Sequence, residues 1–202
     1  MGSSLLLYSY ALMISLAFFT KRLIFPVREE KLVSVLIERD SHLKILGTTN
    51  INSFSCAYQG NIGADTLSIN VQRTENEILL DHAQLSVEVA RFDCGHSGMN
   101  KDFRALLEHE QYPLLKVRLA SLNLSPEKNY EALAEVIIEI AGKLESYTVP
   151  VQLKEEDGEV FYVGRQALNI RDFELTPPKK FLGMIVVDEE VIIDFKLNLS
   201  LL

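Results

Sequence analysis

The chain lacks linkers rich in proline, glycine or serine, repeats at the period of a solenoid, and low-complexity tracts. These absences exclude repeat arrays and argue against several domains joined by flexible segments. Hydrophobic residues make up 48% of the 202 positions, which is enough to bury a full core. We therefore expect one domain of ordinary size, residues 31–202, after an N-terminal segment, residues 1–30.

Basic residues are also scarce, with 20 Lys and Arg against 28 Asp and Glu and a net charge of −8. No cluster of Lys and Arg with interleaved aromatic residues offsets this balance. An acidic surface repels phosphate backbones, so the composition excludes nucleic acid as a partner.

Motifs that carry catalysis or bind metals are missing as well. The sequence has no G-x-S-x-G, P-loop or G-x-G-x-x-G. The four histidines are His42, His82, His96 and His109, and none lies in an H-E-x-x-H or H-x-E pattern. His96 lies near Cys94 and Met99, but a soft-metal site there needs a free Cys94 thiolate. We predict no enzyme activity, no cofactor and no metal site.

The N-terminal segment contains an apolar run, Leu5–Phe19, followed by Lys21 and Arg22. As a helix it would span roughly 22 Å, short of the roughly 30 Å hydrocarbon core of a bilayer. No basic residue precedes the run and no A-x-A-like cleavage site follows it, and the basic residues after it favour a cytoplasmic location for that side. We still expect a signal peptide or an uncleaved membrane anchor, with the domain in the periplasm or otherwise outside the cytoplasm. A buried helix or a misplaced start is the alternative.

The chain has two cysteines, Cys56 and Cys94, 38 positions apart. In an exported chain an even pair predicts a disulfide, which would stabilise the fold by roughly 4 kcal/mol in the chain-entropy model. Two free buried thiols are the alternative. A structural zinc site needs four ligands, so these two thiols cannot form one alone.

A period of two dominates the chain from Leu32 onward. Val191, Ile193 and Phe195 alternate with mostly polar neighbours, which is typical of a strand with one apolar face. The pattern predicts strands over Leu32–Glu38, Ser41–Thr48, Ser53–Asn61, Ile78–Arg91, Leu114–Leu124, Glu131–Ala141, Glu145–Lys154, Val160–Asn169 and Val187–Ser200, with Thr66–Thr74 as a strand or a covering loop. Met99–Leu107 has helical spacing and predicts one short helix.

Short turns separate the strands. They are Ser125–Asn129, Gly142-Lys143 and Glu156–Glu159, of which the last contains the hairpin dipeptide Asp157-Gly158. Such connections join antiparallel neighbours, because parallel strands need a longer crossover. Periodicity leaves two architectures open, a sandwich and a barrel.

Four stretches in order carry a family likeness. They are Leu43–Cys56 (LKILGTTNINSFSC); Phe92–Gly95 with Met99–Phe103, Leu106 and Tyr112-Pro113; Val136–Gly142 with Tyr147–Val151; and Leu168–Phe173 with Pro177-Pro178 and Gly183–Asp188. Together they resemble the YceI-like family, and the first looks closest to a subgroup with a G-T-S-N-V-N-x-F-x-C-type motif. Asp40-Ser41-His42 matches the family's usual Asp-His-Ser start only loosely.

The resemblance implies an all-β fold, an extended antiparallel up-and-down β-barrel of about eight strands, lipocalin-like, with one short helix. It also implies export in bacteria and an apolar ligand in the lumen, an isoprenoid-type lipid such as a polyisoprenoid or a quinone-like molecule. Membrane association would run through the N-terminal segment, and a homodimer is left open.

A lipid lumen of this kind needs aliphatic and aromatic walls and few polar anchors. Each buried CH₂ contributes about 0.8 kcal/mol, so a long chain needs no charged contact. The predicted lining is Val117, Leu119, Ile138, Ile140, Val149, Val151, Phe161, Val163, Ile193 and Phe195. The alternative is that these residues are ordinary core, in an envelope structural or interaction protein whose filled barrel has no ligand.

Overall fold

The computed structural model describes residues 29–62, 66–74, 76–124, 132–180 and 185–202. The predicted signal peptide or anchor falls almost wholly outside these ranges, and so does the predicted turn Ser125–Asn129. Within the described ranges, no helix is both long and apolar enough to traverse a bilayer.

Thirteen strands, one 3₁₀ turn and one α-helix make up the described structure. The strands are β1 (Glu29–Ile37), β2 (His42–Thr49), β3 (Ser53–Tyr58), β4 (Leu67–Arg73), β5 (Glu77–Asp81), β6 (Gln84–Glu88), β7 (Phe92–Asp93), β8 (Leu114–Leu124), β9 (Ala132–Ile140), β10 (Lys143–Glu156), β11 (Glu159–Asn169), β12 (Lys179–Lys180) and β13 (Ile185–Leu201). The 3₁₀ turn η1 covers Val89–Arg91, and helix α2 covers Ser97–Leu106. Helix α2 begins where the His96 side chain accepts a hydrogen bond from the Gly98 N–H at 3.1 Å, a side-chain cap on an otherwise unpaired donor.

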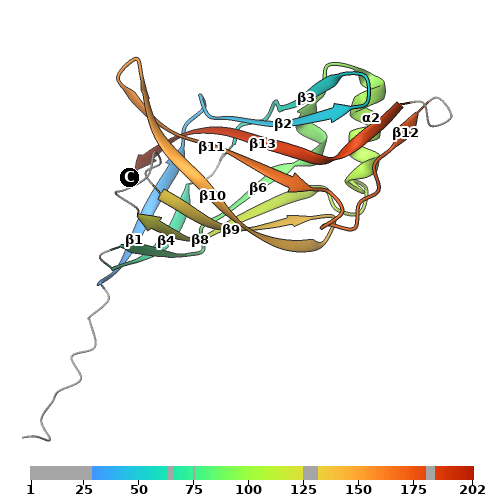
Figure 1. Ribbon diagram of the computed structural model, residues 1–202. Helices are drawn as coiled ribbons and strands as arrows, with labels where there is room; N and C mark the ends of the chain where they lie inside the picture. Colours follow the sequence, from blue (N-terminus) through green and yellow to red (C-terminus); the bar gives the residue numbers. More distant parts are fainter. Residues whose placement is uncertain (1–28, 63–65, 75, 125–131, 181–184) are drawn as a thin grey trace, which may run out of the picture.

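Eight strands close into a ring in the order β1-β4-β5-β8-β9-β10-β11-β13, and β13 returns to β1 (Figure 1). Every pairing in the ring is antiparallel, and the closing pair brings Val35 opposite Leu201. The prediction of an up-and-down antiparallel barrel with one short helix is therefore confirmed. Closure removes the exposed edges that an open sheet would leave.

Two strands of the ring change partner along their length. Strand β13 pairs with β2 over its first part and with β1 at its end, while β8 pairs first with β6 and then with β5. The prediction of one continuous strand over Ile78–Arg91 is therefore wrong, because this segment forms β5, β6 and η1. It breaks at His82, whose φ of 64° interrupts the ladder, and it ends in η1.

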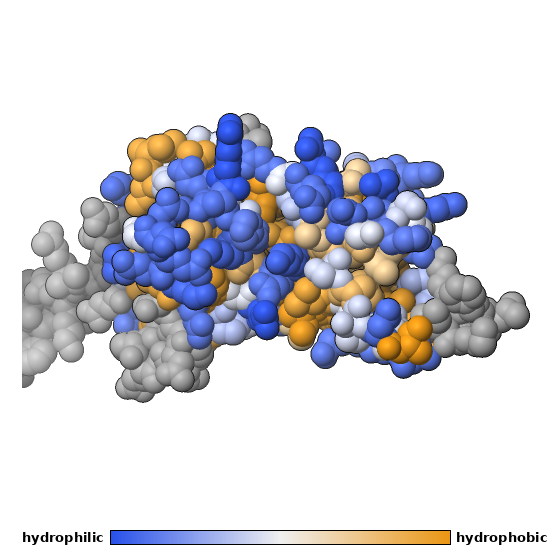
Figure 2. Space-filling model, turned by 90° about the horizontal axis from the view of Figure 1, so that it is seen from above, coloured by the Kyte–Doolittle hydropathy of each residue, from blue (hydrophilic) through white to orange (hydrophobic). Residues whose placement is uncertain are grey.

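The partner changes give the barrel two distinct ends. The helix end carries α2, η1, β3 and β7, whereas the hairpin end carries the β10–β11 turn, the start of β1 and the finish of β13 (Figure 1). The outer face between them is largely hydrophilic in the view of Figure 2, as expected for strands with one polar face.

The helix end holds the most deeply buried side chains. Phe92 is 1% exposed, and its ring lies 5.2 Å from that of Tyr58 and 5.3 Å from that of Phe103 on α2. Phe173 and Leu168 are also fully buried. Aromatic pairs at this separation add to the free energy gained by burial, so the Phe103 ring helps to hold α2 against the barrel.

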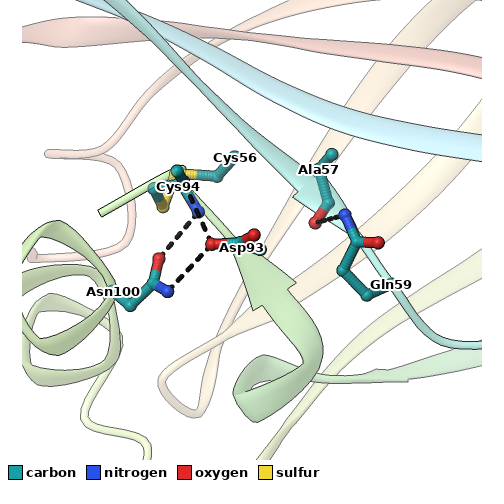
Figure 3. The surroundings of a disulfide bond; sticks show 7 residues. Cys56, Ala57, Gln59, Asp93, Cys94 and Asn100 are labelled. Atoms are coloured by element: carbon teal, nitrogen blue, oxygen red, sulfur yellow. Dashed lines mark hydrogen bonds between the residues drawn. A yellow bond between two sulfur atoms is a disulfide. The ribbon is translucent and has the colours of Figure 1, made fainter. Parts of the chain in front are cut away.

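The predicted disulfide between Cys56 and Cys94 is confirmed, and it lies at the helix end (Figure 3). The Cys94 N–H donates to Asn100 Oδ1 at 2.7 Å, and Asn100 Nδ2 donates to Asp93 Oδ1 at 2.9 Å. The hydrogen bond from Asn100 lowers the pKa of the Asp93 carboxyl. The disulfide therefore joins β3, which contains Cys56, to Cys94 directly after β7. The hydrogen bond from Cys94 to Asn100 links the same point to the first turn of α2.

Candidate functional site

The register of the strands decides which side chains face the barrel interior. Val117 pairs with Ile138, and Ala134 pairs with Val149, so these four side chains lie on the same face of the sheet. Ile138 and Val149 belong to the buried core cluster, and Val117 packs against it. This face of β8, β9 and β10 is therefore the interior one.

The same face continues round the barrel across paired positions. Val151 pairs with Gly164, Gly164 with Phe195, and Phe195 with Leu43 on β2. Eight of the ten predicted lining residues consequently lie together in or against the core cluster: Val117, Leu119, Ile138, Ile140, Val149, Val151, Ile193 and Phe195.

Phe161 and Val163 lie on the opposite face, so their predicted inward direction is wrong. Phe161 pairs with Lys154 and Val163 with Gln152, one position out of phase with Gly164. Phe161 is nevertheless buried, because the Lys196 ammonium lies over its ring at 3.7 Å from the centroid. An apolar residue covered by a lysine gives the same sequence pattern as one covered by the core.

Several interior residues were not among the predicted lining residues. They are Leu43, Ile45, Phe54, Ala134, Val136, Tyr147, Leu168 and Val191, all in or against the core cluster. The period of two could have found Val136, which alternates with Ile138 on β9, and Val191, which alternates with Ile193 on β13. Tyr147 and Ala134 carried no such signal, because a polar tip and a small side chain do not mark an apolar face.

Two interior glycines receive aromatic rings from the neighbouring strand. A β-carbon at Gly164 would lie 2.4 Å from Cζ of Phe195, and one at Gly47 would lie 2.3 Å from Cζ of Phe54. Each ring thus occupies the space that a side chain of the glycine would need, and it lies against the barrel wall. The rings line the interior with aromatic surface, and a β-carbon at either glycine would push the ring toward the barrel axis.

Tyr147 is an interior residue with a polar tip. Its hydroxyl donates to Asp172 Oδ2 at 3.2 Å, and its ring stacks on Phe173. Burial, together with the neighbouring Asp172 carboxylate, raises the pKa of Tyr147 to about 12. The phenol is therefore neutral at any physiological pH and adds no charge to the interior.

Along β10 and β11, burial of the interior face falls from the helix end toward the hairpin end. Val149 and Leu168 are buried, and Val151 is 9% exposed. At the hairpin end Leu153 and its partner Tyr162 continue the interior face, and they are 43% and 37% exposed. On β10 and β11 the apolar interior face therefore continues to the solvent-exposed surface of the hairpin end.

A polar pocket of about 340 Å³ lies on the outer face at the hairpin end. Its lining residues are Asp40, His42, Glu156, Asp157, Glu159, Phe161 and Lys196. Glu156 forms ion pairs with Lys154 at 2.7 Å and with Lys196, and these two cations lower its pKa to about 2.

The acids of this pocket are matched to partners. Asn198 Nδ2 donates to Asp40 at 3.1 Å and to Glu159 at 2.9 Å, and the hydrogen bond with Asp40 raises the pKa of Glu159. Among the described residues no group of three or more His, Cys, Asp or Glu is arranged to hold a metal ion. The apolar interior, rather than this outer pocket, is the site that fits a ligand of low polarity.

Comparison with known proteins agrees with this geometry. A family model described as the YceI-like domain matches residues 36–199. BcnA of Burkholderia cenocepacia has a similar structure, with a TM-score of 0.59 at 19% identity over 79% of this chain and 96% of that one. So does a polyisoprenoid binding domain from Saccharophagus degradans implicated in plant cell wall breakdown, with a TM-score of 0.56 at 13% identity over 84% of this chain and 99% of that one. At these identities the likeness concerns the fold. No curated protein matches the chain.

Proposed function

The chain belongs to the YceI-like domain family, and from that membership and its interior we propose that it binds an apolar, isoprenoid-type lipid inside the barrel. The observation that carries the proposal is a continuous apolar interior face that is buried at the helix end and reaches exposed side chains on β10 and β11 at the hairpin end. The similar Saccharophagus degradans structure is described as a polyisoprenoid binding domain, which supports the same ligand class.

The chemistry of the wall suits such a ligand. A polyisoprenoid or quinone-like tail is a hydrocarbon, and each buried CH₂ contributes about 0.8 kcal/mol without any charged contact. The interior offers aliphatic side chains, the flat rings of Phe54 and Phe195, and a neutral Tyr147 hydroxyl. We expect binding without catalysis, because the described interior residues are mostly aliphatic or aromatic, and the Tyr147 phenol stays neutral.

We further propose that the protein works outside the cytoplasm, in the periplasm or at the membrane. The disulfide at the helix end supports this location, since disulfides persist in oxidising compartments. The apolar run Leu5–Phe19 supports export as a signal peptide or an anchor.

The test is to purify the full chain from its native compartment, extract it with organic solvent and identify the extract by mass spectrometry. We expect an isoprenoid-type lipid at close to one molecule per chain. Recovery of no lipid from well-folded native protein would overturn the proposal and favour an envelope structural protein with a filled barrel.

A blocking variant locates the lipid. Ala134 faces the interior between Leu122 and Val149, whereas the preceding residue, Leu133, faces outward. Ala134→Trp should abolish lipid recovery, and Leu133→Trp should leave it unchanged. If Ala134→Trp does not fold, Leu119→Trp serves the same purpose at a half-buried interior position. A folded blocking variant that retains its lipid would place the ligand elsewhere.

A further inference from the structure

Exposed apolar side chains gather at one end of the barrel. The described residues include nine large hydrophobic side chains that are exposed, and six of these lie at the hairpin end. We name these six the apolar rim: Leu32, Leu153, Val160, Tyr162, Leu201 and Leu202. Figure 2 keeps the left-to-right direction of Figure 1, and its largest hydrophobic area lies toward the left, where the hairpin end lies. Scattered exposed hydrophobic residues are normal on a protein surface, but a concentration at one end indicates an interaction surface.

The members of the apolar rim lie on neighbouring strands. Leu153 pairs with Tyr162, and Tyr162 pairs with Leu197 on β13. The Leu202 N–H then donates to the Ser34 carbonyl at 3.0 Å, which brings Leu202 beside β1 and close to Leu32. Leu153 and Tyr162 also continue the interior face, so the rim joins directly onto the barrel interior.

In the sequence, the apolar N-terminal run precedes β1, whose first residue lies at the hairpin end. Strand β1 begins at Glu29 at the hairpin end, and only nine residues separate Glu29 from the end of Leu5–Phe19. Nine extended residues span at most about 32 Å. A strand as long as β13, with its 17 residues, covers about 56 Å. A bilayer that holds the run is therefore within reach of the rim, and the helix end lies a further barrel length away.

Charge argues for an apolar rather than an electrostatic contact. The hairpin beside the rim, residues 154–159, carries four acids (Glu155, Glu156, Asp157 and Glu159) against Lys154, and Lys196 on β13 adds one further base through its ion pair with Glu156. Anionic headgroups would repel this segment. A surface that attracts the rim must therefore offer burial in acyl chains without a high density of negative charge.

We propose that the apolar rim docks onto a lipid bilayer and opens the barrel interior toward the acyl chains. An isoprenoid-type lipid then passes between bilayer and barrel without crossing water. The transfer step rests on the proposed function, whereas the docking step stands on the rim itself.

The test uses the absence of tryptophan from the chain, which makes any introduced Trp a unique fluorescent reporter. Leu32→Trp reports on the rim from outside the barrel interior, and Ile51→Trp is its matched control at the helix end. Both native side chains are 65% exposed. The full-length variants are mixed with phosphatidylcholine vesicles whose acyl chains are brominated, because bromine quenches only a Trp that enters the hydrocarbon region.

We expect at least threefold stronger quenching for Leu32→Trp than for Ile51→Trp. Depth of immersion is the readout, so attachment through the N-terminal segment alone does not give a positive result. Equal quenching at the two positions, or none at Leu32→Trp, would overturn the proposal. Vesicles containing phosphatidylglycerol should reduce the Leu32→Trp quenching severalfold, and an increase would show that charge, not apolar burial, drives contact.

A rim variant separates docking from lipid binding. Leu32→Ser combined with Leu202→Ser lies outside the core cluster, so the barrel should still release lipid on solvent extraction after loading in detergent. With Leu153→Trp as the reporter in that background, quenching by the vesicles should fall at least threefold. Retained quenching would overturn docking through these leucines, while loss of lipid with intact quenching would instead count against the proposed function.

Discussion

The two ends of this barrel are built from strands with the same alternation of apolar and polar residues, but the apolar face is buried at one end and partly exposed at the other. At the helix end the interior face is sealed by α2, the Cys56–Cys94 disulfide and the rings around Phe92. At the hairpin end the same face continues into Leu153 and Tyr162, which remain exposed. The difference indicates that stabilising contacts are concentrated at the helix end, whereas apolar side chains are left exposed at the hairpin end.

The two tight turns of the barrel repeat this contrast. Ala141-Gly142 joins β9 to β10 with φ values of 48° and 75°, and Asp157-Gly158 joins β10 to β11 with 53° and 85°. Both pairs are left-handed, as two-residue hairpin turns require. A β-carbon at Gly142 would meet Tyr112 at 2.8 Å, whereas one at Gly158 would meet nothing within 4 Å. Turns of the same backbone conformation therefore pack against a side chain at the helix end and lie in open space at the hairpin end.

The largest expected loss of stability follows from removing a buried aromatic ring. Phe92→Ala should lower the free energy of unfolding by about 3–5 kcal/mol, because it leaves a cavity among Tyr58, Phe103 and the disulfide. The control, Leu153→Ala at the hairpin end, should cost about 1 kcal/mol or less. Urea unfolding followed by circular dichroism measures both. Similar losses at the two ends would break the comparison.

Loss of the disulfide should come next. The double variant Cys56→Ala/Cys94→Ala removes a cross-link between residues 38 positions apart, and we expect a loss of about 2–4 kcal/mol. The measurement is the urea midpoint with and without reductant. Reductant should shift the wild type and leave the double variant unchanged. A wild type insensitive to complete reduction would show that the helix end is sealed without the cross-link.

The glycines of the two turns sharpen the comparison further. Gly158→Ala should cost about 1 kcal/mol from the left-handed backbone alone. Gly142→Ala adds displacement of the Tyr112 ring, so its cost should be about 2 kcal/mol or more. Thermal unfolding of the two variants side by side gives the difference. Equal costs would mean that Tyr112 moves away freely.

The smallest effect is electrostatic and belongs to the hairpin end. The pKa of Glu156 is lowered to about 2 by Lys154 and Lys196, so the stabilising contribution of this group is present above pH 4.5 and is lost as the pH falls from 4.5 to 2. The melting temperatures of the wild type and Glu156→Gln should therefore differ by a constant amount above pH 5 and converge below pH 4. The group is exposed, so high salt should shrink the difference. A difference that persists at pH 2 would contradict this assignment.

Much of the fold could be predicted from the sequence, because alternation is local. The strands around Val136 and Val191, the short helix and the Asp157-Gly158 hairpin follow from periods and turn residues that neighbours in the chain determine. The turn between β9 and β10 is Ala141-Gly142, one residue earlier than the predicted Gly142-Lys143. The shift arises because Ala141 adopts the left-handed conformation that glycine would be expected to hold. The choice of a barrel over a sandwich depended on the family likeness, because closure is a property of distant strands.

The interior was predicted less completely for a physical reason. Periodicity shows that two faces differ, but which face is inward depends on the partner strand. On β11 the outward position 161 can hold an apolar residue because Lys196 covers the Phe161 ring. The inward position 164 is a glycine, which interrupts the apolar pattern, because the Phe195 ring fills the space of a side chain there. Likewise, the register shift between Leu119 and Ser121 on β8 arises from a bulge that no residue type announces.

The seam of the barrel has a consequence for how the protein folds. The other pairs in the ring join positions at most 46 apart, as in Glu77 with Asn123, but β1 and β13 meet across 166 positions, as in Val35 with Leu201. Closing a loop of that length costs about 4–5 kcal/mol in chain entropy and makes a slow step. Until the seam forms, both strands present unpaired edges that can pair with other chains. The interval between synthesis of β1 and arrival of β13 is therefore the period in which this barrel is most prone to aggregate.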